Sequence, residues 1–228
     1  MTTPRKLVLI GAGEFAEIAY EYFTHDSPYE VVAFAVEDRF RDAPSLFDLP
    51  IVSVEDLERT HPPDDHAAFV AITNTQLNRV RARLYAATRD RGYPIAKYVS
   101  SRAFVWRNVE IGENSFVFEH NVLQYHVKVG NDVVLWSGNH VGHRTVIRDH
   151  VFMTSHAVIS GYCDVGESSF IGVNACVGDH LTIGRDCTVG MGSVVVRDTE
   201  PGKVYVGNPA KPLEKSSYDT WKVPEALR

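Results

Sequence analysis

Residues 165–195 read VGESSFIGVNACVGDHLTIGRDCTVGMGSVV, and an aliphatic residue recurs at every sixth position of this stretch. Counting in sixes toward the N-terminus extends the series to seventeen successive positions, all of them aliphatic or Met. The series is Val99, Val105, Ile111, Val117, Leu123, Val129, Leu135, Val141, Ile147, Met153, Ile159, Val165, Ile171, Val177, Ile183, Val189 and Val195. A period this short suits one short strand and one turn per repeat. Residues 99–195 therefore predict a solenoid of short strands.

Glycine, Asn and Asp follow many of the repeat positions, as in EIGENS, KVGNDV and TIGRDC. These residues tolerate the left-handed backbone angles that tight turns require. The turns of the solenoid are therefore expected directly after the repeat aliphatics.

The chain before residue 99 has a different pattern, in which apolar runs alternate with helical periodicity. Strands are predicted at 6–13, 31–36, 50–54, 66–73 and 95–100, and helices at 14–23, 54–60 and 77–92. Alternating strands and helices predict a parallel sheet covered by helices, with ligands at the carboxyl ends of the strands. We therefore expect an α/β, Rossmann-like domain over 1–98 and the repeat domain over 99–228.

Composition excludes several functional classes. The formal net charge of −6 argues against a nucleic-acid-binding surface. No apolar stretch is long enough to span a membrane, and the N-terminal sequence lacks a signal-peptide pattern, so a cytoplasmic protein is expected. The three cysteines, Cys163, Cys176 and Cys187, lack CxxC spacing, so neither a disulfide framework nor a zinc site is indicated. We expect them to be small, buried or half-buried residues.

The repeat resembles that of the hexapeptide-repeat acyltransferases, whose repeats wind into a left-handed parallel β-helix with three hexapeptides per coil. The layout resembles the sialic-acid O-acetyltransferase and bacillosamine N-acetyltransferase family, because a βαβ domain precedes the repeats and VYVGNPAKPL follows them. The resemblance covers nearly the whole chain. It implies a homotrimer that transfers an acetyl group from acetyl-CoA to a sugar.

Seven histidines lie in the repeat domain, at positions 120, 126, 140, 143, 150, 156 and 180. In the β-helix that the resemblance implies, residue i stacks on residues i−18 and i+18, about 4.8 Å away. No two of the histidines between 140 and 156 share a column, and no pair of the seven has the five-residue spacing of the β-helical carbonic anhydrases. We therefore expect no metal site. Surface or interface positions are the expectation for His150 and His180.

His143 is the candidate general base. The resemblance places the base of the sugar acetyltransferases eight residues after a repeat aliphatic, here Leu135, in a motif that reads HRTVI in this chain. The 18-residue step sets Gly161 beside His143, and the family uses a glycine there to donate an N–H to the thioester oxygen. A base and an oxyanion donor about 5 Å apart suit acyl transfer, because one removes the proton and the other stabilises the developing charge.

The acyl transfer is expected to be direct, without an acyl-cysteine intermediate. No motif pairs a cysteine with a histidine and an orienting acid.

Three residues around the base depart from the family pattern or have open roles. Arg144 follows His143 where the bacillosamine-type enzymes have an acid, so the group that orients the imidazole is not indicated. The candidates are a backbone carbonyl, Asn139 and a residue of a neighbouring chain. Trp136 is expected to stack on Phe118 and either to line the acceptor pocket or to serve packing or a trimer contact.

Coenzyme A contacts are implied by the resemblance alone. The family binds coenzyme A in the groove between two β-helices of a trimer, mostly through backbone groups of the later coils. The corresponding positions are Val173 and Met191 in the coils, and Gly207, Pro209 and Lys211 in the tail GNPAK. Gly161 is expected to contact the thioester.

The first turn reads GAGEFA, which fits G-x-G-x-x-A between a strand and a helix. An NAD-dependent oxidoreductase is the rival interpretation, but only half a dinucleotide fold fits before residue 99. The family resemblance instead puts a nucleotide-linked sugar here, although Phe15 replaces the histidine of the common GxxGH form. The candidate residues are Gly11, Gly13, Glu14, Asp38, Asn74 and Arg79.

The sequence thus predicts an acetyl-CoA-dependent acetyltransferase that acts on the amino group of a nucleotide-linked amino sugar. O-acetylation of a sugar is the alternative within this class. A noncatalytic β-helical scaffold and a metal-dependent hydratase are the alternatives from other classes.

Overall fold

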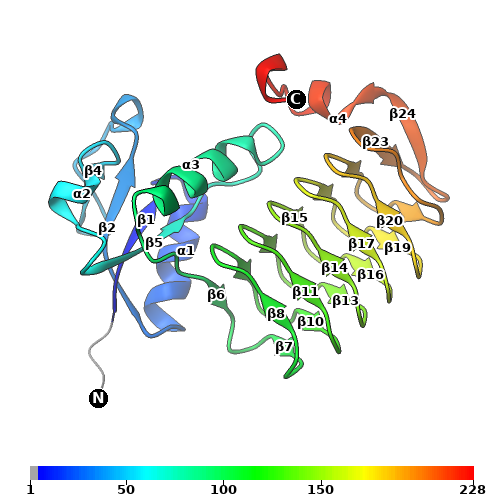
Figure 1. Cartoon of the computed structure of the whole chain (residues 1–228), viewed down its shortest axis with the longest axis horizontal. Coiled ribbons are helices and arrows are strands. Elements are labelled where there is room, and N and C mark those ends of the chain that lie inside the picture. Colours follow the sequence, from blue (N-terminus) through cyan, green and yellow to red (C-terminus); the bar gives the residue numbers. More distant parts are fainter. Residues whose placement is uncertain (1–4) are drawn as a thin grey trace. The chain divides into compact units, whose positions relative to one another are not determined.

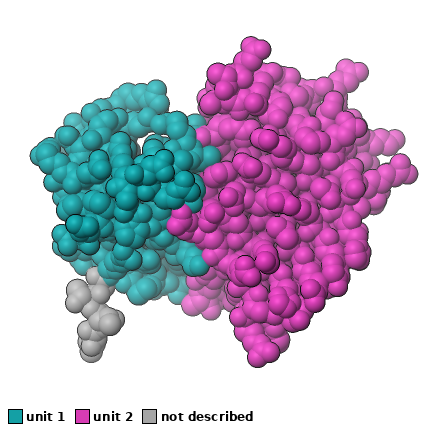
Figure 2. All heavy atoms as spheres, in the orientation of Figure 1, with its two compact units in different colours: residues 1–73, 80–98 teal, residues 74–79, 99–228 magenta. Residues whose placement is uncertain are grey.

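The computed structural model describes residues 5–228, which form two compact units (Figures 1 and 2). The first unit comprises residues up to 73 together with 80–98. The second comprises 74–79 together with 99–228, so residues 74–79 group with the repeats.

The first unit is built around a five-stranded sheet with the order β3-β4-β2-β1-β5, in which β1, β2, β4 and β5 run parallel. Its strands are β1 (Arg5–Ile10), β2 (Tyr29–Val36), β3 (Ser45–Leu46), β4 (Leu49–Ser53) and β5 (His66–Val70). Its helices are α1 (Glu14–His25), η1 (Asp38–Phe40), α2 (Leu57–Thr60) and α3 (Arg79–Asp90). The predicted alternation of parallel strands and helices is thus observed.

Two parts of the first unit differ from the sequence prediction. The antiparallel strand β3 was not predicted; it pairs with β4 through a tight turn at Phe47 and Asp48, both with positive φ. The turn lacks the glycine that marks most such hairpins. The strand predicted at 95–100 shrinks to an isolated bridge at Ile95 and to β6 (Tyr98–Val99), which begins a sheet of the β-helix.

The second unit winds through three parallel sheets, and Figure 1 shows its coils stacked from green to orange. We name each face by its strand in the central coil. The β13 face contains β7 (Phe104–Val105), β10 (Val122–Leu123), β13 (His140–Val141), β16 (Val158–Ile159), β19 (Cys176–Val177) and β22 (Val194–Val195). The β14 face contains β8 (Glu110–Ile111), β11 (Lys128–Val129), β14 (Val146–Ile147), β17 (Asp164–Val165) and β20 (Thr182–Ile183).

The β15 face begins with β6 and continues through β9 (Phe116–Val117), β12 (Val134–Leu135), β15 (Phe152–Met153), β18 (Phe170–Ile171) and β21 (Thr188–Val189). It ends with β23 (Lys203–Val206) and the antiparallel β24 (Lys211–Ser216). The chain ends with α4 (Ser217–Thr220) and η2 (Glu225–Leu227). These stacked parallel sheets fit the predicted left-handed β-helix.

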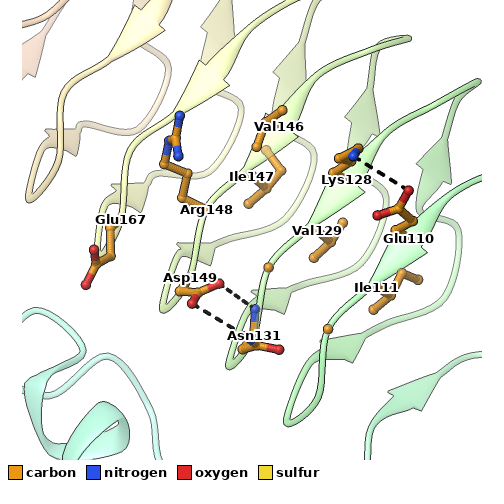
Figure 3. A pocket seen from close by; sticks show the side chains of 12 residues that line it. Glu110, Ile111, Lys128, Val129, Asn131, Val146, Ile147, Arg148, Asp149 and Glu167 are labelled. Atoms are coloured by element: carbon orange, nitrogen blue, oxygen red, sulfur yellow. Dashed lines mark hydrogen bonds and ion pairs between the residues drawn. The ribbon is translucent and has the colours of Figure 1, made fainter.

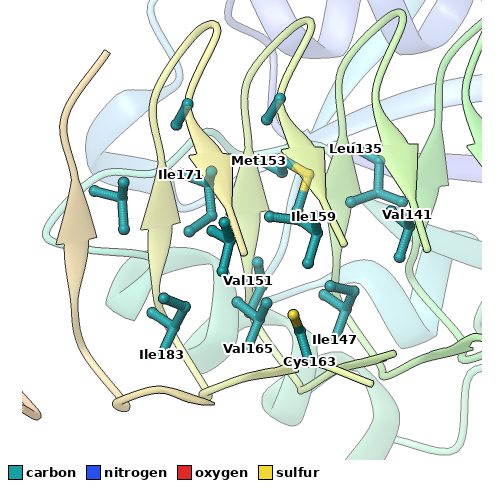
Figure 4. Packing of buried hydrophobic residues seen from close by; sticks show 14 of the residues in the cluster. Leu135, Val141, Ile147, Val151, Met153, Ile159, Cys163, Val165, Ile171 and Ile183 are labelled. Atoms are coloured by element: carbon teal, nitrogen blue, oxygen red, sulfur yellow. The ribbon is translucent and has the colours of Figure 1, made fainter. Parts of the chain in front are cut away.

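The register of the coils is a constant 18 residues, since His140 pairs with Val122 on one side and with Val158 on the other. All seventeen repeat aliphatics lie in or against the interior core, and Figure 4 shows several of them packed there, among them Leu135 and Ile171. Cys163 and Cys187 are buried and Cys176 is half-buried, as expected.

A second period of six governs the turns. Fourteen positions from 114 to 192, each six residues apart, have positive φ. They are Asn114, His120, His126, Asp132, Gly138, Arg144, His150, His156, Tyr162, Ser168, Asn174, His180, Asp186 and Gly192. Five of the seven histidines therefore occupy left-handed turn positions, where Asn, Asp and His are the best tolerated residues after glycine. This backbone requirement explains their number without a metal.

Residues 74–79 form a left-handed turn that packs on the β-helix. Gln76, Leu77 and Asn78 have φ values of 51°, 51° and 68°, and α3 begins only after them. The Asn78 side chain donates to the carbonyl of Ser168 at 3.2 Å. Arg79 forms a 2.6 Å ion pair with Asp186.

None of the helices over residues 5–228 is long and apolar enough to cross a membrane.

Candidate active site

His143 lies on the edge between the β13 and β14 faces, which we call the His143 edge. Gly142 permits this turn, because a Cβ there would lie 2.5 Å from the carbonyl carbon of Ser160 in the next coil. The backbone N–H of His143 donates to Oε1 of Gln124 at 3.0 Å, and its carbonyl accepts from Tyr162 N–H at 2.9 Å. The turn is therefore tied to both neighbouring coils.

The imidazole of His143 is exposed, and its ring lies 5.2 Å from the Tyr162 ring in an edge-to-face arrangement. Within residues 5–228, neither ring nitrogen hydrogen-bonds to a side chain or carbonyl, so both are available to a ligand. Asn139, the proposed orienting residue, does not contact it. Asn139 is almost fully buried, and its amide contacts the Trp136 carbonyl and the Ala157 N–H.

Gly161 lies directly beside His143, as the 18-residue step predicts. A Cβ built on Gly161 would lie 2.6 Å from Cε1 of His143 and 3.0 Å from both ring nitrogens. Only glycine leaves room for the imidazole in this position. The sequence suggested a different reason for glycine here, a backbone N–H that faces the thioester.

The Gly161 N–H already has an acceptor in this structure. It donates to Oδ1 of Asp179, one coil further, at 2.8 Å. The same type of hydrogen bond, from a backbone N–H to a side-chain oxygen one coil further, recurs elsewhere in the β-helix. One example is the bond that Asn131 Oδ1 accepts from the Glu113 N–H. An incoming oxyanion can therefore bind this N–H only after the Asp179 carboxylate moves away.

Substitution of Gly161 by Ala is expected to displace the His143 ring without unfolding the coil. A misplacement of about 1 Å can lower turnover by about 10²-fold, and we expect a loss of that order in kcat. Gly178→Ala is the matched control, because a Cβ there meets its nearest atom, Cδ1 of Leu181, at an ordinary 3.4 Å. Steady-state kinetics and thermal melts of both variants would test this; equal kcat values would contradict the assigned contact.

The buried cysteines are poor nucleophiles. Burial raises the pKa of the Cys163 thiol and, likewise, the pKa of the Cys187 thiol. Because the thiolate is the reactive form, both side chains are disfavoured as acyl carriers.

The proposed coenzyme A contacts in the coils lie on another edge. Val173 and Met191 precede the turn residues Asn174 and Gly192, on the edge between the β15 and β13 faces. Met191 is 81% exposed and Val173 is 39% exposed. These two residues and His143 thus flank the β13 face on its two sides.

The tail residues line a groove of about 390 Å³ at the end of the β-helix. Pro209 and Lys211 line it together with Arg197 and two acids, Asp198 and Glu200. Gly207 precedes the groove with φ +97°, and its N–H donates to Oγ of Ser193 at 3.2 Å. Two cationic side chains at one groove are compatible with phosphate binding.

Trp136 packs on Phe118 with a centroid distance of 4.5 Å and an interplanar angle of 9°, as predicted. It follows β12 and therefore lies at the edge where the β15 and β13 faces meet, not at the His143 edge.

The glycine-rich turn opens onto a pocket of about 330 Å³ within the first unit. Gly11 and Gly13 line it, and Glu14 is exposed in the first turn of α1. A Cβ on Gly11 would lie 2.7 Å from the carbonyl oxygen of Ala71, whereas the space around Gly13 is open. Gly13 is thus the position at which a ligand has room to approach the backbone.

Two acids line this pocket: Glu37, one residue before the predicted Asp38, and Asp42. Glu37 directly follows β2, and its carboxylate accepts hydrogen bonds from Arg83 at 3.1 and 3.0 Å and from Arg39 at 3.2 Å. The hydrogen bond from Arg83 is the main reason that the pKa of Glu37 is lowered. Phe40, 60% exposed, also lines the pocket.

Asn74 and Arg79 both form hydrogen bonds within the second unit. The Asn74 carbonyl accepts from Asn78 N–H at 3.2 Å. The Arg79 guanidinium contacts Asp186 and the carbonyl of Leu227.

A groove of about 530 Å³ runs along the β14 face (Figure 3). Its cations are paired with acids: Lys128 lies 3.6 Å from Glu110, and Arg148 contacts Asp164 through two hydrogen bonds. Within residues 5–228 we find no group of three or more His, Cys, Asp or Glu side chains arranged to hold a metal ion.

The fold is similar to that of solved sugar acetyltransferases. A perosamine N-acetyltransferase from Caulobacter crescentus, crystallised as a histidine-to-asparagine variant with CoA and GDP-perosamine, matches with a TM-score of 0.83 and 26% identity. The match covers 92% of this chain and 97% of that one. The acetyltransferase domain of PglB from Neisseria gonorrhoeae, solved with acetyl coenzyme A, matches with a TM-score of 0.82 and 28% identity, over 92% and 99% of the two chains.

Curated relatives match over a shorter range. An acyl-[acyl-carrier-protein]–UDP-N-acetylglucosamine O-acyltransferase from Aliivibrio fischeri is 31% identical over 85 residues, which is 37% of this chain. The match spans about a third, 32%, of that protein's length. No protein-family model matches the chain.

These relatives are acetyl- or acyltransferases, and two of them were solved with CoA or acetyl-CoA bound, which confirms the acyltransferase assignment. Over about nine-tenths of its length, the chain therefore resembles the hexapeptide-repeat sugar acetyltransferases, as its sequence predicts.

Proposed function

We propose that the protein transfers the acetyl group of acetyl-CoA to the amino group of a nucleotide-linked amino sugar, with His143 as general base. The observation that carries the proposal is the exposed imidazole packed on Gly161, with both ring nitrogens available to a ligand. The match to a perosamine N-acetyltransferase with CoA and GDP-perosamine supports the same chemistry. We also propose a cytoplasmic location.

The nucleotide is assigned to the pocket of the first unit, which we propose is a Rossmann-like domain over 1–98. The parallel strands have the order β4-β2-β1-β5, as in one half of a doubly wound sheet. Gly13 lies at the N-terminus of α1, where backbone N–H groups and the helix dipole favour phosphate. Glu37, at the carboxyl end of β2, replaces Asp38 as the candidate for the ribose hydroxyls.

The reaction proceeds by direct attack. His143 removes a proton from the nitrogen of the acceptor as that nitrogen attacks the thioester carbonyl. The tetrahedral oxyanion is stabilised by an N–H donor, for which Gly161 is the candidate once Asp179 has moved away. The intermediate then collapses, the C–S bond breaks, and coenzyme A leaves as the thiolate.

Coenzyme A is assigned to the edge that carries Val173 and Met191, with its phosphates at the groove lined by Pro209 and Lys211. Because Val173 and Met191 lie on a different edge from His143, one site can use both sets only if a second copy supplies one of them. A homotrimer satisfies this requirement.

The β13 face is the proposed trimer interface. Its outward-facing column is mostly apolar, whereas the column of the β14 face is mostly polar. The first column is Phe104, Val122, His140, Val158, Cys176 and Val194; the second is Glu110, Lys128, Val146, Asp164 and Thr182. Exposed apolar columns of this kind mark protein contacts.

We therefore expect light scattering to give the mass of three 25.5 kDa chains. Val158 lies near the centre of the β13 face and is 40% exposed. Val158→Asp places a charge in the proposed interface and should shift the measured mass toward that of one chain. Val146→Asp on the β14 face is the control and should leave the trimer intact. A monomeric wild-type protein would refute the shared site.

O-acetylation is the second candidate, because the curated relatives are named as O-acyltransferases. A matched pair of nucleotide sugars, one with an amino group and one with a hydroxyl at the same carbon, decides between them. We expect thiol release from acetyl-CoA with GDP-perosamine or a related amino sugar, and little with the hydroxyl partner. The reverse preference would support the O-acetyltransferase.

A further inference from the structure

Arg144 occupies an unusual position beside the candidate base. It is exposed, it follows His143 directly, and it adopts the left-handed turn conformation with φ 59°. Its guanidinium carbon lies 5.4 Å from the centre of the Tyr125 ring and 6.0 Å from that of Tyr162. The two tyrosines thus hold a guanidinium at the His143 edge, in a left-handed position that bulky side chains rarely take.

The charge of Arg144 has no counterpart in the chain. Within residues 5–228, no carboxylate forms an ion pair with it, whereas Arg148 contacts Asp164 and Arg185 contacts Asp186. A guanidinium stacked on rings presents a planar fork of N–H donors, which suits a carboxylate or phosphate. The donors of Arg144 are therefore available to an anion from outside the chain.

The His143 edge also differs from the rest of this acidic protein. Between residues 125 and 180 its exposed side chains are aromatic or basic except for Asp179, whereas the edge between the β14 and β15 faces carries five carboxylates, of which Asp132 and Asp186 are buried. The first set is Tyr125, His126, His143, Arg144, Tyr162 and His180; the carboxylates are Glu113, Asp132, Asp149, Glu167 and Asp186. The carboxylate on the His143 edge, Asp179, accepts the Gly161 N–H. Basic and aromatic side chains thus outnumber carboxylates on this stretch of the edge with the candidate base, and Arg144 is the arginine there without an ion pair within residues 5–228.

We propose that Arg144, held by Tyr125 and Tyr162, forms an anion subsite that binds an acidic group of the acceptor next to the reacting atom. This inference rests on the proposed function, because His143 defines where the acceptor nucleophile lies. The pantetheine arm near the thioester is uncharged, so the anion belongs to the acceptor. Its source is either a carboxylate on the sugar or the phosphate of the pyrophosphate that is bonded to the sugar, the other phosphate being the one proposed at Gly13.

The test compares two nucleotide-linked amino sugars that differ only in a carboxylate in place of the hydroxymethyl group. We would measure kcat/KM for both with the wild type, Arg144→Asn, Arg144→Lys and Arg102→Asn. Asn tolerates the left-handed turn, and Arg102 is an exposed arginine on another edge of the β-helix. Calorimetry gives the dissociation constants of the same two sugars and so tests the subsite without requiring turnover.

A wild-type preference for the carboxylate sugar of about 10- to 100-fold, lost in Arg144→Asn and partly kept in Arg144→Lys, identifies the sugar carboxylate. Equal use of both sugars, with KM raised about tenfold or more for both in Arg144→Asn, identifies the pyrophosphate. If Arg144→Asn and Arg102→Asn have the same kcat/KM for both sugars, the subsite is refuted. It is also refuted if Arg144→Asn changes only the oligomeric mass. No acetylation of either sugar refutes the proposed function, and binding then still decides the subsite.

Discussion

Replacement of His143 by Ala is expected to lower kcat by about 10²- to 10⁴-fold, the usual contribution of a general base. The imidazole is exposed, and its nitrogens have no hydrogen-bond partner within residues 5–228, so its loss removes the proton acceptor without breaking a structural bond. The coil should remain folded because the ties of residue 143 to its neighbours, to Gln124 and Tyr162, involve backbone atoms.

Two measurements separate catalysis from binding in this variant. The dissociation constant of coenzyme A should change little, whereas single-turnover acetyl transfer should show the full loss. His120→Asn is the control, because His120 is an exposed turn histidine on another edge with φ 60°, a conformation that Asn tolerates. A kcat for His143→Ala equal to that of the control would remove His143 from the mechanism.

Replacement of Arg79 by Ala is expected to destabilise the second unit by about 3 kcal/mol. The Arg79–Asp186 pair is 2.6 Å long, with only 14% and 1% of the two side chains exposed. Removal of Arg79 takes away one of the positive charges that stabilise the buried Asp186 carboxylate. It also breaks the hydrogen bond to the carbonyl of Leu227. The loss should lie at the lower end of the range for buried pairs, because Tyr218 and Arg185 still contact Asp186.

Arg148→Ala is the matched control for Arg79→Ala. The Arg148–Asp164 pair is in the same unit, but 56% and 33% of its side chains are exposed, so its loss should cost about 1 kcal/mol or less. Denaturant unfolding of both variants, followed by circular dichroism, gives the difference. Equal free energies of unfolding for Arg79→Ala and Arg148→Ala would show that the Arg79–Asp186 pair does not stabilise the fold more than an exposed pair does. Arg79 would then again be a candidate for ligand binding.

Much of the fold can be predicted from the sequence, because the residue at every sixth position points into the interior of the β-helix. The aliphatic series predicts the core, and the 18-residue step predicts that Trp136 stacks on Phe118 and that His143 lies beside Gly161. The hairpin at Phe47 and Asp48 was not predicted, since its turn lacks the glycine that usually marks a two-residue hairpin loop.

The site is less predictable, because hydrogen-bond partners depend on side-chain rotamers and not on spacing. The sequence could not show that Asp179 accepts the Gly161 N–H, or that Arg79 contacts Asp186. It indicated an acid after β2 but selected Asp38, whereas Glu37 lines the pocket. The sequence also did not show that five of the histidines occupy left-handed turn positions, which depends on backbone angles.

The most direct test of the central claim is mass spectrometry of the products formed from acetyl-CoA labelled in its acetyl group, with GDP-perosamine and a panel of UDP- and dTDP-linked amino sugars. We predict that one member gains a single labelled acetyl group on nitrogen while free coenzyme A appears in equal amount. Binding of acetyl-CoA and of the sugars without any labelled sugar product, or hydrolysis of acetyl-CoA to coenzyme A and labelled acetate, would contradict the account.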